Sequence, residues 1–233
     1  MNDIKDKIIT VKKQTINSYI FRPMLFSTPM VQAILEGRKT QTRRMCKVQP
    51  ENGCYVELNM KSSLVEFDTN EGIDNKYCKF SVSIGDIIWV RETFLMKQSS
   101  NESKLYIHKA DCSSEHLEHY AGQWKPSLFM PKEACRLFLE ITNIRVERLN
   151  EISKEDAINE GIQPLLMSRM QQIQSGQLYR NYLSKDELFN DGLSAINSYK
   201  SLWQKINVIN SWSENPFVWV YNFKVIECPE RFL

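Results

Sequence analysis

The chain has 233 residues, of which 42% are hydrophobic and 25% charged, a composition that suits one large domain or a domain with a long insertion. No run approaches the roughly 18 apolar residues that cross a bilayer, and residues 1–14 lack the apolar centre of a signal peptide. We therefore expect a soluble, cytoplasmic protein with no membrane contact. The net charge of +2 is uneven: residues 1–50 hold ten Lys and Arg against three Asp and Glu. Such an excess of positive charge is found in proteins that bind an anionic partner, and equally on an ordinary solvated basic face.

Residues 1–20 are polar and predict an N-terminal arm or a first edge strand. The apolar run that follows, residues 19–27, predicts a strand that enters the core. A short helix comes next in "STPMVQAILEG", because Ser27 or Thr28 can cap it and Pro29 suits its first turn. We expect this helix to end at Gly37 in a left-handed conformation.

The middle of the chain reads mostly as strands. Residues 48–80 predict a hairpin-like excursion, and "IGDIIWVRETFLM" predicts a strong strand opened by a Gly-Asp turn. A further strand is expected in "KLYIHKAD", followed by a loop, "WKPSLFMP", with two prolines. The alternating stretch 133–149 is long enough for one bent strand or for two.

A second short helix is predicted by "SKEDAINEG", in which Ser153 and Asp156 resemble a capping box. It ends in Glu160 and Gly161, as the first helix ends in Glu-Gly. Residues of about 163–194 are rich in Gln, Ser and Asn and predict an insertion that is partly helical. An amphipathic helix over 195–207 and a closing strand over 216–227, buried on both sides, complete the chain. Strands outnumber helices without regular alternation, which favours a β-barrel with helical decorations over a Rossmann fold.

The cysteines and histidines do not predict a disulfide framework, a metal site or a cofactor. The six cysteines form no C-x-x-C pair, so free thiols are expected. His108, His116 and His119 lie close together, and the last two have the spacing of a metal pair on a helix. An ordinary surface helix turn is the preferred interpretation.

The basic stretch "EGRKTQTRR", residues 36–44, carries the most specific signal. Gly37, Lys39 and Arg44 match the G-x-K-x-x-x-x-R signature of the ASCH superfamily, whose domains are small β-barrels related to the PUA fold. The wording "FSTPMVQAILEGRKTQTRR", "GDIIWVRETF", "WKPSLFMP" and "NPFVWVYNFKVI" resembles the longer ASCH proteins carried by phages and prophages. The resemblance covers most of residues 21–227. It implies an α+β fold, a PUA-like mixed β-barrel of about six strands, as a single domain over 21–233 with an insertion at about 163–194.

The resemblance also implies a function. ASCH domains are presumed to bind RNA, and some small bacterial members are amidohydrolases that remove the acetyl group from N4-acetylcytidine with a Thr, a Lys and a Glu. Their motif, G-x-K-T-x-T-x-R, is matched position by position by Gly37, Lys39, Thr40, Thr42 and Arg44. Glu160 is the best match to their Glu, so Lys39, Thr42 and Glu160 are the implied catalytic set. This chain is roughly twice as long, and the additional residues put the substrate pocket in doubt. A ribonuclease is the weaker alternative, since some ASCH members cleave RNA.

Amide hydrolysis needs a nucleophile, a base and an oxyanion stabiliser. Thr42 offers a hydroxyl, and Lys39 becomes a base only if burial and adjacent cations lower its pKa. Glu160 could orient Lys39 or shuttle a proton, but pairing with it would also raise the pKa of the lysine. Alternatively, Lys39 and Arg44 are structural ion-pair partners of Glu36, Glu92 or Glu160, with no catalysis.

Binding alone would use a wider set of side chains. A nucleic-acid or nucleoside module would draw on Arg38, Lys39, Arg43 and Arg44, of which Arg38 and Arg43 are expected to be solvated or steering charges. Further candidates for substrate contact are Arg44 and the residues Trp89, Arg91, Glu92, Trp124 and Lys125. Period 2 places Trp89 and Arg91 on one strand face, which suits stacking on a base but equally a core. An RNA or a modified nucleoside is the expected partner, in a basic cleft.

Overall fold

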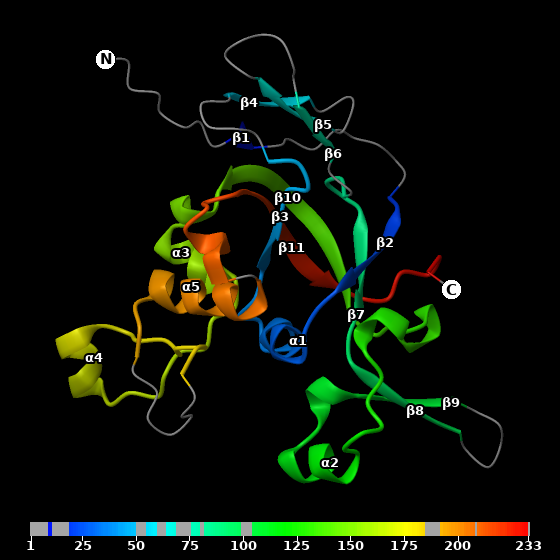
Figure 1. Ribbon diagram of the computed structural model, residues 1–233. Coiled ribbons are helices and arrows are strands. Elements are labelled where there is room, and N and C mark those ends of the chain that lie inside the picture. Colours follow the sequence, from blue (N-terminus) through cyan, green and yellow to red (C-terminus); the bar gives the residue numbers. More distant parts are fainter. Residues whose placement is uncertain are drawn as a thin grey trace, which may run out of the picture.

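We analysed a computed structural model of the chain, which describes nine stretches of it: residues 9–10, 19–49, 55–59, 64–68, 76–79, 82–98, 104–184, 192–207 and 209–232. The fold is a mixed α+β arrangement, as the sequence predicts (Figure 1). Most of the expected N-terminal arm, and parts of the excursion at 48–80 and of the insertion at 163–194, lie outside the described residues. None of the described helices combines the length and the apolar character that a bilayer crossing requires.

One curved sheet organises the molecule. Its path runs β2-β7-β10-β11-β3, with β2 and β7 parallel and the other neighbours antiparallel. The strands are β2 (Phe21–Leu25), β7 (Ile87–Arg91), β10 (Phe138–Arg148), β11 (Phe217–Ile226) and β3 (Gln41–Met45), and β1 (Ile9–Thr10) also pairs with β10. The stretch over 133–149 holds one long strand, whose register shifts between Ile141 and Asn143. Such an irregularity bends a strand without ending it.

The expected closed β-barrel is not found in the described part of the chain. No ladder joins β2 to β3, which form the two ends of the strand path. A side chain spans the opening instead, because Nη2 of Arg44 on β3 donates to the main-chain oxygen of Leu25 on β2 at 2.7 Å. Among the described strands the sheet is therefore open, and β3 has a free edge beside this contact.

Helices cover both faces of the sheet near β11, which explains the nearly continuous apolar run of that strand. Trp219 and Tyr221 face a core that includes Val31 of α1 (Thr28–Leu35). Val218 and Val220 point to the opposite face. That face packs against α3 (Lys154–Asn159) and α5 (Ala195–Ile206), which lie side by side in Figure 1. The prediction of a closing strand buried on both sides is confirmed for residues 217–223, whereas Lys224 and Val225 are exposed.

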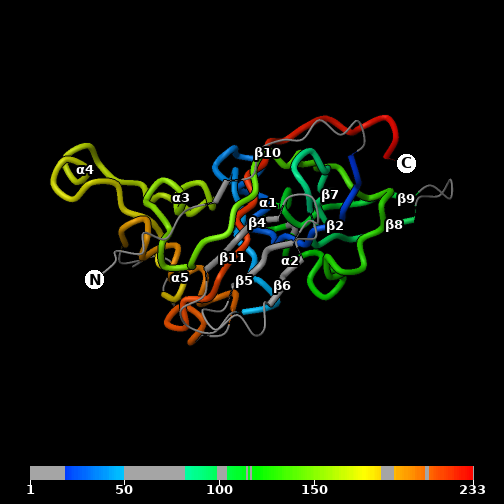
Figure 2. Tube along the Cα trace, turned by 90° about the horizontal axis from the view of Figure 1, so that it is seen from above, coloured from blue at the N-terminus to red at the C-terminus, as the bar shows by residue number. Residues whose placement is uncertain are grey.

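Smaller elements extend from this body. The run expected as one strand at 84–96 is split, since β8 (Phe94–Gln98) leaves the sheet and forms a hairpin with β9 (Lys104–His108). Two further helices are α2 (Ser114–His119) and α4 (Arg169–Ser175), and α4 projects at the far side from β8 and β9 in both views (Figures 1 and 2). Single 3-10 turns are η1 (Lys109–Asp111), η2 (Ser127–Phe129), η3 (Lys132–Ala134), η4 (Leu149–Glu151) and η5 (Ile209–Trp212). A separate antiparallel sheet holds β4 (Tyr55–Asn59), β5 (Leu64–Asp68) and β6 (Lys76–Lys79).

Candidate ligand pocket

Two helix ends meet at the basic motif. The chain leaves α1 through Gly37 and leaves α3 through Gly161, both with positive φ (+73° and +84°). Gly161 is required for two reasons, its positive φ and its close packing. A Cβ there would lie 2.7 Å from the Cβ of Lys39 and 2.9 Å from that of Ala33. This close approach brings the residue after α3 alongside the loop after α1. Gly161 therefore packs against Ala33 of α1 and against Lys39, two residues beyond Gly37.

Lys39 and Glu160 form a buried pair at this contact. Their backbones make an isolated β-bridge, and Nζ of Lys39 donates to Oε2 of Glu160 at 2.8 Å and to its main-chain oxygen at 2.9 Å. Burial lowers the pKa of Lys39, and although Glu160 opposes this effect, the pKa stays below its ordinary value. Burial is thus the largest cause of this lowered pKa, and the carboxylate of Glu160 the largest opposing one.

Arg43 lies at the centre of the buried charges, which corrects the expectation of a solvated or steering cation. Its Nη1 donates to Oε1 of Glu160 at 3.0 Å, its Nη2 to Oδ2 of Asp156 at 3.0 Å, and its Nε to Oε1 of Glu147 at 3.1 Å. Burial alone would lower the pKa of Arg43, but Glu160, and after it Tyr199 and Glu147, hold the pKa above its ordinary value. Its side chain has no exposed surface.

A third cation completes what we call the ion-pair network. Nε of Arg145 donates to Oε2 of Glu147 at 2.9 Å, and Nη2 of Arg145 pairs with Oδ2 of Asp156. Each carboxylate of the network thus contacts two cations, as burial of charge requires. Its members are Lys39, Arg43, Arg145, Glu147, Asp156 and Glu160.

The sheet explains why these residues meet. Val220 of β11 lies between Arg43 of β3 and Arg145 of β10 in the strand register, so all three share the face that α3 covers. Sequence reasoning missed Arg145 and Glu147 as site residues. The available signal was the segment "NIRVER", where charged residues recur at every second position of a strand that is otherwise apolar.

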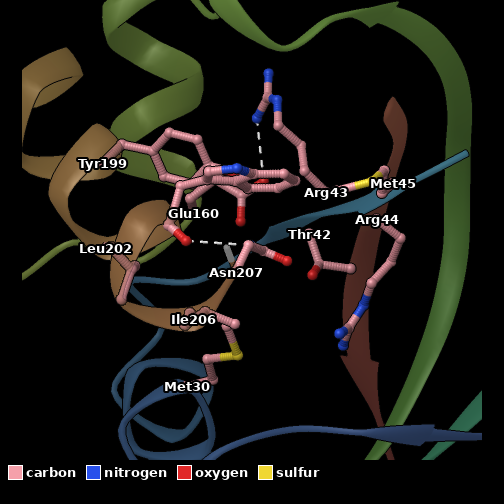
Figure 3. A pocket seen from close by; sticks show the side chains of 11 residues that line it. Met30, Thr42, Arg43, Arg44, Met45, Glu160, Tyr199, Leu202, Ile206 and Asn207 are labelled. Carbon is pink, nitrogen blue, oxygen red and sulfur yellow. Dashed lines mark hydrogen bonds and ion pairs between the residues drawn. The ribbon is translucent and has the colours of Figure 1, made fainter. Parts of the chain in front are cut away.

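A pocket lies at the free edge of β3 (Figure 3). Its volume is about 450 Å³ when the open solvent at its mouth is included. It is lined by Met30 of α1, by Thr42, Arg43, Arg44 and Met45 of β3, by Glu160, and by Tyr199, Leu202, Trp203, Ile206 and Asn207 at α5. Thr42 and Glu160, two of the three residues of the implied catalytic set, therefore share one pocket. Lys39 does not line it and reaches it only through Glu160. Among the described residues, no hydrogen bond engages the Thr42 hydroxyl.

The wall opposite β3 is apolar and aromatic. The Tyr199 ring is buried, and the Arg43 guanidinium carbon lies 5.8 Å from its centroid. Burial, and next to it Glu160, raises the pKa of Tyr199 well above its usual range, so its hydroxyl keeps its proton. Trp203, interpreted from the sequence as core, is a core residue that also lines the pocket. Nδ2 of Asn207 donates to the main-chain oxygen of Trp203 at 3.1 Å, which fixes how the amide faces the pocket.

Arg44 forms the pocket wall nearest to β2. Besides its bond to Leu25, its guanidinium carbon lies 5.3 Å from the centroid of the Phe26 ring. Burial lowers the pKa of Arg44, although an arginine keeps its charge in a protein. Its Nε is buried and has no hydrogen-bond partner among the described residues. The role of Arg44 as a grip for an anion stays a prediction.

The four cations proposed for nucleic acid divide into two pairs. The side chains of Lys39 and Arg43 have no exposed surface and are bound to carboxylates, so in this conformation a phosphate does not reach them. Arg38 is partly exposed and donates to the main-chain oxygen of Gly161 at 2.7 Å and to Glu36. Only Arg38 and Arg44 of the four keep exposed surface.

The remaining predicted contact residues lie away from the pocket. Trp89 is buried in a core with Phe138 and Phe232, and Arg91 stacks on it at 5.4 Å, on the same face as period 2 predicts. Glu92 is buried and receives two bonds from Arg136, at 3.0 and 3.2 Å.

Trp124 and Lys125 lie beside the β8–β9 hairpin. The Trp124 ring packs edge-on against Tyr120, while the Lys125 side chain is exposed and its backbone pairs with Phe94. None of the five residues Trp89, Arg91, Glu92, Trp124 and Lys125 lines the pocket at β3.

Comparisons with models of protein families, with curated protein sequences and with solved structures gave no match to this chain. Among the described residues, no group of three or more His, Cys, Asp or Glu side chains is arranged to hold a metal ion. The side chain of His116, one of the three histidines considered above, lies outside the description.

Proposed function

We propose that this chain is an ASCH-type module that binds an uncharged modified nucleoside in the pocket at the free edge of β3. The observation that carries the proposal is that Thr42 of the basic motif and Glu160 at the end of α3 line the same pocket. The ASCH resemblance implies the same two residues together.

The charge distribution supports a neutral ligand over a polynucleotide. The three cations and three carboxylates of the ion-pair network balance one another, so the network leaves no excess positive charge for a chain of phosphates. Among the described residues of the pocket wall, Arg44 is the one cation outside this balance, and it is bound to a main-chain oxygen. The wall offers flat aromatic surface at Tyr199 and Trp203, together with the Thr42 hydroxyl and the Asn207 amide. Aromatic rings suit the face of a base, and the polar groups suit its edge and substituent.

Amide hydrolysis is a second candidate function, favoured by one specific observation. The Thr42 hydroxyl has no partner among the described residues and lies in the same pocket as Glu160, which in turn contacts a lysine of lowered pKa. In this scheme Thr42 Oγ1 attacks the acyl carbon of an N4-acylated cytosine, and its proton passes through the Glu160–Lys39 pair to the leaving amine. Water then hydrolyses the threonine ester and releases the acid.

A titration distinguishes these functions. N4-acetylcytidine, cytidine, N4-acetylcytidine 5′-monophosphate and a short single-stranded RNA would each be titrated into the protein by calorimetry, with chromatography of the mixtures. We expect saturable binding of N4-acetylcytidine, weaker binding of its monophosphate, and loss of binding in Thr42→Val. Thr40→Val is the matched control, because Thr40 belongs to the same motif but is exposed and outside the pocket. Cytidine and acetate in the mixture would establish the hydrolase. Binding of RNA alone would reject the nucleoside proposal.

A further inference from the structure

The carboxylate of Glu160 is held at both oxygens, and the two donors come from one short segment. Oε2 accepts from Lys39 at 2.8 Å and Oε1 accepts from Nη1 of Arg43 at 3.0 Å. We propose that Arg43 is the positioning residue for Glu160: through its guanidinium fork it fixes the plane in which the carboxylate faces the pocket. The inference deepens the proposed function and rests on it for its effect on ligand binding. Arg43 lies outside the three-residue set implied by the motif.

Arg43 can fix Glu160 because Arg43 itself is immobilised. Its Nε and Nη2 are bound to Glu147, and Nη2 also donates to Asp156. A guanidinium is planar, so contacts on one side of the fork determine where Nη1 points on the other. Glu147 lies on the long strand β10, in the middle of the sheet, and is itself held by Arg145. The sheet, rather than the short helix α3, therefore determines the orientation of Glu160.

Arg43 also balances the charge of the network. Without Arg43, three carboxylates would face two cations, and Oε1 of Glu160 would be a buried acceptor with no donor in the network. A buried oxygen in that position either rotates toward another donor or takes up a proton. Both responses change what the pocket presents, because Glu160 lines the pocket and Lys39 reaches it only through Glu160.

The shape of the fork, and not only its charge, matters in this account. A lysine at position 43 would keep one positive charge but could not contact Glu147, Asp156 and Glu160 along three fixed directions. Arg43→Lys therefore separates positioning from simple neutralisation. Arg136→Met is a matched control, since Arg136 also makes a two-bond contact to a buried carboxylate, Glu92, away from the pocket.

The test combines crystal structures of Arg43→Lys and Arg43→Met with calorimetric titration of N4-acetylcytidine. We expect the Glu160 carboxylate to leave its wild-type rotamer in both variants, and affinity to fall about tenfold or more, as for the loss of one charge-assisted hydrogen bond. Affinity in Arg136→Met should stay within about twofold of wild type. If Arg43→Met does not fold, Arg43→Lys, which retains the charge, decides alone.

The rotamer and the affinity answer different questions. If the wild-type protein does not bind N4-acetylcytidine, the proposed function fails, and the positioning role is judged on the Glu160 rotamer alone. A Glu160 carboxylate that keeps its orientation and its contact with Lys39 in Arg43→Lys would overturn the inference. So would unchanged affinity in that variant when the wild type binds.

Discussion

Nζ of Lys39 contacts two oxygens of the same residue, Oε2 of Glu160 at 2.8 Å and its main-chain oxygen at 2.9 Å. This relationship ties the loop after α1 to the residue that follows α3, far apart in the sequence. Glu160 lines the pocket, and Lys39, which does not line it, donates to the Glu160 carboxylate. The ion pair that the sequence offered as one alternative is present, and the proposed function would use the same two residues.

Removing the lysine should therefore cost stability. Lys39→Met leaves Oε2 of Glu160 and a main-chain oxygen without their donor in a buried site, and we expect a loss of about 3–5 kcal/mol in the free energy of unfolding. Urea denaturation followed by fluorescence measures it. Arg38→Met is the neighbouring control, which should cost only about 1 kcal/mol because Arg38 is partly exposed. Equal losses in the two variants would contradict the account of the buried pair.

Gly161 makes the approach of the two helix ends possible, so its substitution tests the packing directly. In Gly161→Ala the new Cβ would meet the Cβ atoms of Lys39 and Ala33 at under 3 Å, in addition to the positive φ. We expect a loss of about 3 kcal/mol or more, with displacement of Glu160. Gly176→Ala shares a positive φ but has open space around it, so it should cost only about 1 kcal/mol. Thermal unfolding of the two variants side by side gives the comparison.

The contact of the partly exposed Arg136 with the buried Glu92 carboxylate should matter for stability but not for the pocket. Arg136→Met leaves the Glu92 carboxylate buried without its main partner, which costs about 3 kcal/mol. Affinity for N4-acetylcytidine should be unchanged, because neither residue lines the pocket. A large loss of affinity with little loss of stability would restore Glu92 as a ligand contact and argue against the pocket at β3.

The pH dependence of stability has a predictable sign at Cys135. Burial raises the pKa of this thiol to about 11, above its ordinary value of 9.0. Between these values the unfolded chain loses the proton while the folded chain keeps it, so stability falls as pH rises through this window. Because the thiol is partly solvated, we expect about 1–2 kcal/mol of extra loss from pH 8 to 11 in wild type relative to Cys135→Ala. Denaturation curves at four pH values measure this difference, and parallel curves would contradict it.

The sequence predicted local features better than the closure of the sheet. The start of α1 and its end at Gly37 were predicted from the proline and the glycine, because these act within one helical turn. Ser27 stands at the N-cap position as expected, but its side chain makes no capping hydrogen bond. Period 2 placed Trp89 and Arg91 on one face. Whether β2 and β3 pair depends on the curvature of the whole sheet, and no local sequence pattern predicts that curvature. The ASCH resemblance implied a closed barrel, and the described strands form an open sheet bridged by Arg44.

The site was predicted in part for a similar reason. The motif residues Lys39 and Thr42, with Glu160 from the resemblance, lie within one small region. The burial of Arg43 could not be predicted, because alternation shows which residues share a face but not which face a helix will cover. Glu147 and Asp156 neutralise Arg43 only once α3 lies over β10, which is a tertiary contact.

A crystal structure of the protein soaked with N4-acetylcytidine tests the central claim most directly. We predict the base against Tyr199 and Trp203, and the N4-acyl group between Thr42 Oγ1 and the Glu160 carboxylate, which keeps its contacts with Lys39 and Arg43. An empty pocket at concentrations that saturate the calorimetric titration, or a nucleoside bound away from Thr42 and Glu160, would contradict the account.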